Sequence, residues 1–221
     1  MKRTQKLNWF IAVLLFLGSS NASFAQTTIK DFFNNNGIAI AYLGIDYYKA
    51  RLINDPGSNP SDIKNRLFAS MNEVVVTEGP KHFDIAGAFS RGSFVNSDIT
   101  AVTARNEKIN ANDISSANTS DFSRLTEADI AAEVKTLNLK DKNGVGLVFI
   151  MEGMKKEEKK SYGSVWVTLI DMKTKKVLMT ERLEQEAAGF GFRNFWVSII
   201  KKSLVEIEKK KYKLWKSKYG S

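Results

Sequence analysis

The chain has 221 residues, no cysteine, one histidine and a formal net charge of +9 at pH 7. The absence of cysteine excludes disulfides, thiolate metal sites and thiol nucleophiles, and a single histidine excludes a metal site built from several histidines. Fourteen Phe, six Tyr and four Trp against three Pro indicate a packed globular domain rather than a disordered chain.

Residues 1–25 predict an export signal. A basic start without any acid precedes the apolar run Trp9–Leu17, and Ser23 and Ala25 place small residues where a signal peptidase reads them. The run is short for a bilayer span, and no cysteine is present to carry a lipid. We therefore expect cleavage before Gln26 and a periplasmic or secreted protein that is not a lipoprotein. Residues 26–221 are expected to form a single globular domain.

The first structural elements are a buried strand and a capped helix. The almost uninterrupted apolar run Gly37–Asp46 predicts a strand covered on both faces, and the turn residues of 47–59 predict a loop. Asn59 before Pro60 is typical of a helix start, so a helix is expected over about Ser61–Thr77. Its apolar stripe consists of Ile63, Leu67, Met71 and Val74.

The middle of the chain is polar. His82–Phe89 is interpreted as a second strand, and the following residues, at about 93–124, are interpreted as a polar insertion on the surface. Asn106–Asp121 contains few large apolar residues and is expected to bury little surface. Deletion of residues 106–120 is then expected to leave stability nearly unchanged.

Regular periodicity returns at Thr126, which forms the outline of a capping box with Asp129. A short amphipathic helix follows, with Ile130, Val134 and Leu137 on one face. After it the sequence predicts three strands and a long helix. The strands are Gly144–Met151, Gly163–Asp171 and Lys176–Leu183, the exposed turn is Lys155–Lys160, and the helix is marked by Trp196, Ile199, Ile200, Leu204 and Ile207.

This order of elements predicts an α/β (α+β) fold: a mixed twisted sheet with a C-terminal β-hairpin, flanked by about three helices. The hairpin Tyr162–Leu178 has the sequence YGSVWVTLIDMKTKKVL. It resembles the amino-terminal domain of TolB and the related curli-secretion protein CsgG, although Lys175 stands where that family favours Gly. Gly189–Trp196, with the sequence GFGFRNFW, is similar to a segment shared by a group of uncharacterised exported proteins. The resemblance implies a TolB-like fold and an envelope accessory module that binds other proteins, with no catalytic residues.

The sequence offers little chemistry for an enzyme. His82 lies at the entry to a predicted strand, where a surface or capping role is expected. The glycines of Gly189–Phe192 do not complete a dinucleotide-binding pattern, so we interpret this segment as a tight approach that lets Phe190, Phe192, Phe195 and Trp196 pack. Arg193, at the helix start, remains a candidate contact for a small anion. We expect no catalytic residue, no cofactor and no metal.

The positive charge is concentrated at the carboxyl end. Nine basic residues against two acids lie between Arg193 and Ser221, whereas Gln26–Phe192 has one net negative charge, so we expect no nucleic-acid partner. The basic tail at about 209–221 has two interpretations. It is either a solvated helix end whose aromatic residues close over the domain, or a contact with an anionic membrane surface or polyanion. The candidate contacts are Lys209, Lys210, Lys211, Lys213 and Trp215.

Two functions remain open at this point. The first is a non-enzymatic accessory module of the cell envelope with an unidentified protein partner. The second is a peripheral membrane or polyanion binder that uses the lysine-rich helix. An enzyme is a remote third possibility, since it would require Arg193 and several carboxylates in one cleft.

Overall fold

The computed structural model describes residues 27–92 and 95–221, so the predicted export signal lies outside the described residues. Seven strands in these ranges form one sheet. They are β1 (Ile40–Asp46), β2 (Arg51–Ile53), β3 (Val95–Ser97), β4 (Ser115–Ser116), β5 (Val145–Lys156), β6 (Ser161–Asp171) and β7 (Lys176–Glu186).

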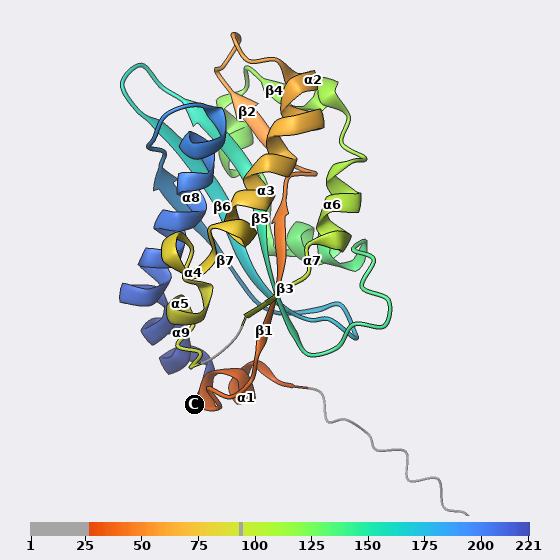
Figure 1. Cartoon of the computed structure of the whole chain (residues 1–221), viewed down its shortest axis with the longest axis vertical. Coiled ribbons are helices and arrows are strands. Elements are labelled where there is room, and N and C mark those ends of the chain that lie inside the picture. Colours follow the sequence, from red (N-terminus) through yellow and green to blue (C-terminus); the bar gives the residue numbers. More distant parts are fainter. Residues whose placement is uncertain (1–26, 93–94) are drawn as a thin grey trace, which may run out of the picture.

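The long strand β5 organises the sheet (Figure 1). β1 and β2 lie one after the other along one side of β5, both parallel to it, and β3 and β4 add short parallel pairs outside them. On the other side β6 and β7 form an antiparallel hairpin with β5. The predicted mixed sheet and its α/β class are therefore confirmed.

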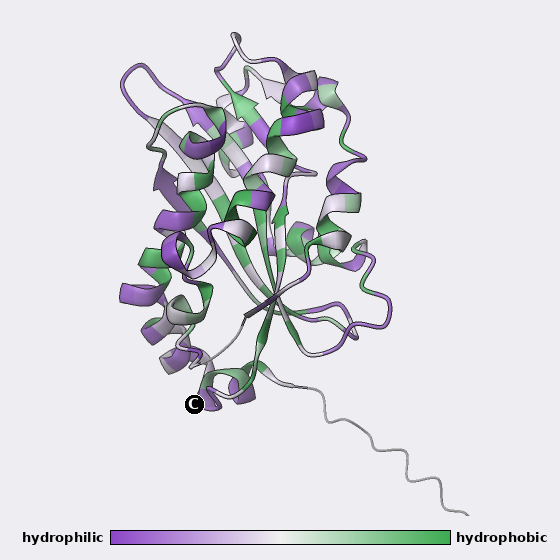
Figure 2. Cartoon of the chain, in the orientation of Figure 1, coloured by the Kyte–Doolittle hydropathy of each residue, from purple (hydrophilic) through white to green (hydrophobic). Residues whose placement is uncertain are grey.

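Helices cover both faces of the sheet (Figure 1). One face packs against α1 (Ile29–Asn34), α3 (Phe68–Thr77), α5 (Ile85–Ala88), α8 (Phe192–Glu206) and α9 (Tyr212–Tyr219). The other packs against α6 (Thr100–Asn106) and α7 (Glu127–Lys135). The shorter helical pieces are α2 (Pro60–Asp62), η1 (Ile63–Leu67), α4 (Gly79–His82), η2 (Ala111–Asp113), η3 (Thr119–Ser123) and η4 (Ile207–Lys211). Apolar residues line the layers where helices meet the sheet (Figure 2).

Both predicted helix starts are confirmed. The Asn59 side chain accepts hydrogen bonds from the backbone N–H groups of Ser61 and Asp62, at 3.0 and 3.2 Å, directly before α2. Thr126 and Asp129 form a capping box at the start of α7. These bonds satisfy donors that have no partner within the helix, and a polar cap of this kind stabilises a helix by about 1 kcal/mol.

Two π turns, η1 and η4, change the spacing at which buried apolar residues recur in the helices that contain them. In η1 the buried positions step by five residues from Ile63 to Phe68, so that Phe68 is in the core and Leu67 is only half-buried. In η4 the same step runs from Ile207 to Tyr212. A regular α-helix repeats every 3.6 residues, so the π turn keeps the residues after it facing the core.

The predicted strand His82–Phe89 is wrong. This stretch ends α4, whose first turn contains Pro80, and continues into α5. Asp84 caps α5 by accepting a hydrogen bond of 2.7 Å from the N–H of Gly87. Proline near a helix start and an acidic cap favour helical turns over a strand. The predicted loop 47–59 likewise contains the strand β2.

The interpretation of residues 93–124 as a surface insertion is also wrong. This stretch contributes β3, α6 and β4, and Ile109, Ile114 and Phe122 are buried. The side-chain oxygen of Asn106 accepts a hydrogen bond of 2.8 Å from the N–H of Tyr47, and its amide donates to the carbonyl of Ile45. The segment is integrated into the fold because isolated apolar residues and polar side chains, rather than an apolar run, attach it to the sheet.

The carboxyl-terminal hairpin is confirmed and is longer than predicted. β5 and β7 continue beyond the expected strand ends to Lys156 and Glu186, and the turn at Met172–Lys175 joins β6 to β7. Lys175 has a φ of 56°, in the left-handed region that favours glycine. Lys175 therefore places a side chain at a position where the backbone conformation is strained for any residue other than glycine.

Candidate functional site

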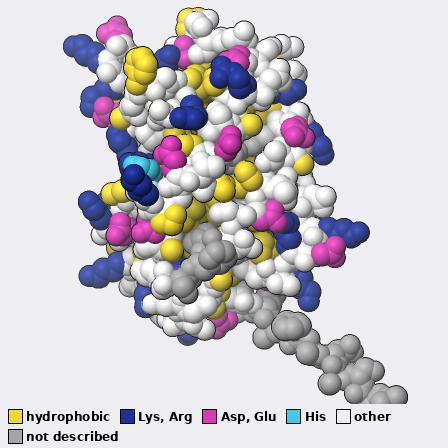
Figure 3. All heavy atoms as spheres, in the orientation of Figure 1, with side chains coloured by type: hydrophobic (Ala, Val, Ile, Leu, Met, Phe, Trp, Pro, Cys, Tyr) yellow, Lys and Arg dark blue, Asp and Glu magenta, His cyan; other side chains and the backbone are white. Residues whose placement is uncertain are grey.

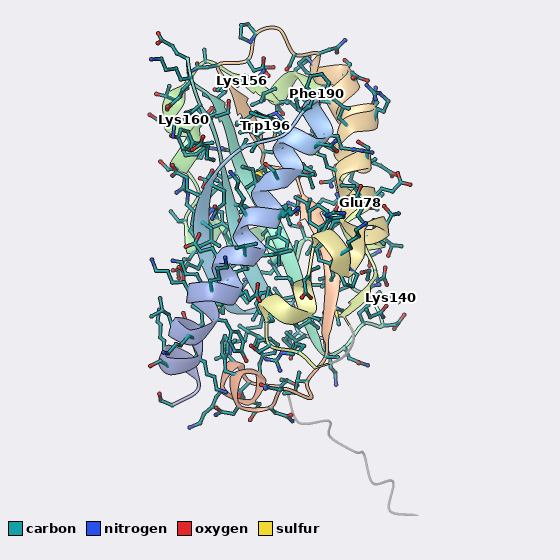
Figure 4. All side chains as sticks on the ribbon, turned by 60° about the vertical axis from the view of Figure 1, so that its left-hand side comes forward. Glu78, Lys140, Lys156, Lys160, Phe190 and Trp196 are labelled. Atoms are coloured by element: carbon teal, nitrogen blue, oxygen red, sulfur yellow. The ribbon has the colours of Figure 1, made fainter. Side chains whose placement is uncertain are left out.

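The loop before α8 presents an exposed phenylalanine. Phe190 is 95% exposed, between Gly189 and Gly191, whose φ angles of 122° and 74° are in the left-handed region. Figure 4 shows Phe190 at the amino-terminal end of α8, at the same end of the molecule as Lys156 and Lys160 of the β5–β6 hairpin. The expectation that Phe190 packs against the sheet is wrong, because the two glycines turn this residue away from the core.

The rest of this segment packs as expected. Trp196 is buried, and the rings of Phe192 and Phe195 lie 6.3 and 5.0 Å from its ring in edge-to-face contact. Arg193 is exposed in the first turn of α8, and its Nε donates to the side chain of Asn194. Arg193 is therefore a surface residue and does not form a buried anion site.

The predicted contacts on the carboxyl-terminal helix divide between two sides. The exposed ones are Lys209, Lys210 and Lys213. Trp215 is buried, and both its ring nitrogen and the amine of Lys211 donate to the carboxylate of Glu181 on β7. Burial raises the pKa of Glu181, but these two bonds outweigh it and hold the pKa below its ordinary value. Trp215 and Lys211 are thus removed from the set of surface contacts, because they attach the helix to the sheet.

Charged residues missed by the sequence interpretation lie at the end of β1. Asp46 is buried, and one of its oxygens lies 2.8 Å from the guanidinium of Arg105 on α6. Arg105 also pairs with Glu133 of α7, which lies 3.4 Å from Lys49, and the guanidinium stacks 4.3 Å from the ring of Tyr48. Burial raises the pKa of Asp46, and the positive charge of Arg105 opposes that shift. The charges are satisfied within the cluster, which joins α6 and α7 to the sheet.

A second buried ion pair joins Glu152 of β5 to Arg182 of β7. Glu152 is fully buried at a β-bulge and accepts hydrogen bonds from the Nε of Arg182, at 2.8 Å, and from the ring nitrogen of Trp166, at 3.1 Å. Its other oxygen accepts from the N–H of Leu125, and Arg182 also donates to the carbonyl of Phe122. This pair connects the polar middle segment to β5 and β7. No periodic signal could reveal it, because its members are far apart in the sequence.

A small cleft lies between α3 and α6, beside the part of β1 that continues beyond its pairing with β3. Its volume is about 220 Å³. Asn72 fills the gap in the sheet, since its amide accepts from the N–H of Ile45 and donates to the carbonyl of the same residue. Asn106 does the same for Tyr47 and Ile45. Both amides at the floor are committed to the backbone, which leaves rim side chains such as Lys64 for a ligand.

The described residues contain no group of three or more His, Asp or Glu side chains that could hold a metal ion. The single histidine, His82, is visible at the surface in Figure 3 and is half-buried in α4. Residues 27–92 and 95–221 also contain no helix that is both long and apolar enough to cross a bilayer.

The sheet and its two helical layers define a three-layer α/β protein whose buried charges serve its own packing. The chain matches no family model and no curated protein sequence. Among solved structures it is similar to the crystal structure of lipoprotein GNA1162 from Neisseria meningitidis. That similarity has 15% sequence identity and a TM-score of 0.31 and covers 76% of this chain and 99% of the other. A TM-score of 0.31 is too low to carry a shared fold or function to this chain.

Proposed function

We propose that this chain is an exported, non-enzymatic accessory protein of the cell envelope, TolB/CsgG-like in fold, that binds another protein through the loop around Phe190. The exposure of Phe190 is the observation that carries this proposal. Burial of a phenylalanine side chain contributes about 1.5–3 kcal/mol, and the folded chain gains almost none of it at a residue that is 95% exposed. Binding of a partner with an apolar pocket would bury the ring and so contribute this free energy to the complex.

The loop is held in place around this ring. The N–H of Ala188 donates to the hydroxyl of Ser198 at 2.9 Å, and the N–H of Phe195 donates to the carbonyl of Gly191 at 3.0 Å. Because both flanks are attached to α8, less conformational entropy is lost when a partner covers Phe190. Aromatic side chains are also the residue type most often found at the centre of protein interfaces.

Photo-crosslinking in intact cells tests the proposal. A photoreactive phenylalanine analogue at position 190 should give a discrete crosslinked protein. The same analogue at Val76, which is exposed at 39% on α3, should not. A second arm tests affinity: Phe190→Ser should reduce recovery of that protein at least tenfold without lowering the melting temperature. Equal crosslinking from both positions, or unchanged recovery with Phe190→Ser, would contradict the proposal.

A further inference from the structure

The rotation of the carboxyl-terminal helix is fixed by its buried side. Tyr212 and Trp215 are buried, Tyr219 packs against the core, and Trp215 and Lys211 both bond to Glu181. The opposite side of α8, η4 and α9 must then face solvent. Its exposed lysines, termed here the lysine row, are Lys201, Lys209, Lys210, Lys213 and Lys216.

The lysine row lacks compensating charge. Lys211 points inward and pairs with Glu181 and Glu206, but no member of the row forms an ion pair with any residue in 27–92 or 95–221. Residues 201–221 contain eight basic and two acidic residues, whereas residues 27–200 contain 22 of each and are formally neutral at pH 7. The charge of the described chain is therefore concentrated on this one helix.

The row also extends along much of the carboxyl-terminal helix. From Lys201 to Lys216 the helix rises by about 22 Å, at about 1.5 Å per residue. Two aliphatic side chains are exposed on the same helix, Val205 at 40% and Leu214 at 54%. Exposed lysines with aliphatic groups interspersed on the same helix suit the interface of an anionic bilayer.

We propose that the lysine row docks this protein on an anionic phospholipid surface. A bilayer is favoured over an acidic protein because the aromatic residues that would anchor a protein interface, Tyr212 and Trp215, are buried. Glu208 is the one exposed acid beside the row. A nearly uniform positive row complements the uniform negative charge of an anionic bilayer better than a protein surface on which charges of both signs alternate. This docking goes beyond the proposed function and does not depend on it, since Phe190 lies at the other end of α8 (Figure 4).

Vesicle sedimentation tests the docking. The probe is a vesicle of phosphatidylglycerol and phosphatidylcholine, with pure phosphatidylcholine as the neutral comparison, and the protein is the chain from Gln26 to Ser221. The helix variant carries Lys209→Ser, Lys210→Ser and Lys213→Ser. The matched control carries Lys140→Ser, Lys159→Ser and Lys173→Ser, which remove the same charge from exposed lysines elsewhere. Melting curves establish that both variants are folded.

The unchanged protein should bind the anionic vesicles at low salt and lose binding near 1 M salt, where the Debye length falls to about 3 Å. The helix variant should bind about 100-fold more weakly, since each lysine near an anionic surface contributes about a fivefold gain. The control variant and Phe190→Ser should bind like the unchanged protein.

Three outcomes would overturn the proposal: no binding to anionic vesicles at low salt, equal weakening of the helix and control variants, or capture of an acidic protein without any vesicle binding.

Discussion

The two faces of the sheet differ in how much buried charge pairs contribute beside their apolar cores. The face covered by α3 and α8 is an apolar core rich in aromatic rings, including the stacked pair Tyr47 and Phe68 with ring centres 4.1 Å apart. The face covered by α6 and α7 has fewer buried apolar side chains and contains the ion pairs of Asp46 and Glu152. Apolar packing therefore dominates on one side of the sheet, whereas the other side combines a smaller apolar core with buried, directional charge pairs.

This difference determines how each face should respond to substitution. Apolar packing loses free energy in proportion to the contacts removed. A buried charge pair gives little net stability while intact but is costly when one member is removed, because the remaining charge is left without a partner. The following variants separate the two behaviours, from the largest expected effect to the smallest.

Deletion of residues 106–120 should have the largest effect, because this segment serves both faces. It removes Asn106, which bonds to β1, the buried residues Ile109 and Ile114, and the strand β4. We expect no cooperative unfolding transition by circular dichroism. A melting temperature within a few degrees of that of the unchanged protein would show that the segment is dispensable, as its polar composition first suggests.

Trp196→Ala tests the apolar face. Trp196 is 1% exposed, so its truncation should lower the free energy of unfolding by about 3–5 kcal/mol. Phe190→Ala is the matched control six residues earlier and should cost less than about 0.5 kcal/mol, because the ring is exposed. Chemical denaturation measures both values, and a loss below 1 kcal/mol for Trp196→Ala would remove α8 from the core.

Arg182→Met tests the charged face. It leaves the fully buried Glu152 without its cation, and we expect a loss of about 3 kcal/mol. Adding Glu152→Leu should recover much of that loss, because the unpaired charge then disappears. A double variant that is less stable than Arg182→Met would argue that the ion pair contributes net stability of its own.

Asp98 tests the charged face through pH. Hydrogen bonds from the side chains of Lys142 and Thr100 lower the pKa of Asp98 to about 2. Because the folded pKa lies below the ordinary value, the stabilisation is present above about pH 4 and is lost as pH falls through 2. Asp98→Asn should therefore cost about 1 kcal/mol or less at pH 7, since the side chain is partly exposed, and only a small part of that at pH 2. A pH-independent difference between the two proteins would contradict this account.

Lys175→Gly should have the smallest effect and belongs to neither face. Glycine relieves the left-handed backbone at this turn, and the relief exceeds its entropic cost in the unfolded chain, so we expect a gain of about 0.5–1 kcal/mol. Lys173→Gly, in the same turn, is the control and should be neutral or destabilising. Thermal unfolding distinguishes the two.

The sequence predicts the apolar face better than the charged one. Strand 37–46, the capped helix after Asn59 and the long helix through Trp196 were predictable because their apolar residues recur at a regular period. The segment 93–124 was not, because its buried residues are isolated between polar ones. The ion pairs of Asp46 and Glu152 join residues distant in sequence, and no local pattern records them.

The candidate contacts were only partly predictable, for a related reason. Counting in steps of three and four places Tyr212, Trp215 and Tyr219 on one aromatic stripe of the helix but cannot show which way that stripe faces. The five-residue step from Ile207 to Tyr212 places Trp215 and Lys211 toward the sheet. The glycines around Phe190 predict a tight approach that packs the ring. Their left-handed conformation, which only the backbone reveals, instead leaves the ring exposed.

The π turn η4 has a consequence for how the length of this chain can vary. It contains one residue more than a regular helix needs between Ile207 and Tyr212. Loss of one residue from 207–211 would convert the turn to ordinary α-helix and leave Tyr212 and Trp215 buried against the core. The same loss within 192–206 would rotate everything beyond it by about 100°, turning the aromatic residues to solvent and the lysines to the core. In homologous chains whose helix is one residue shorter, the missing residue is therefore expected to fall within η4.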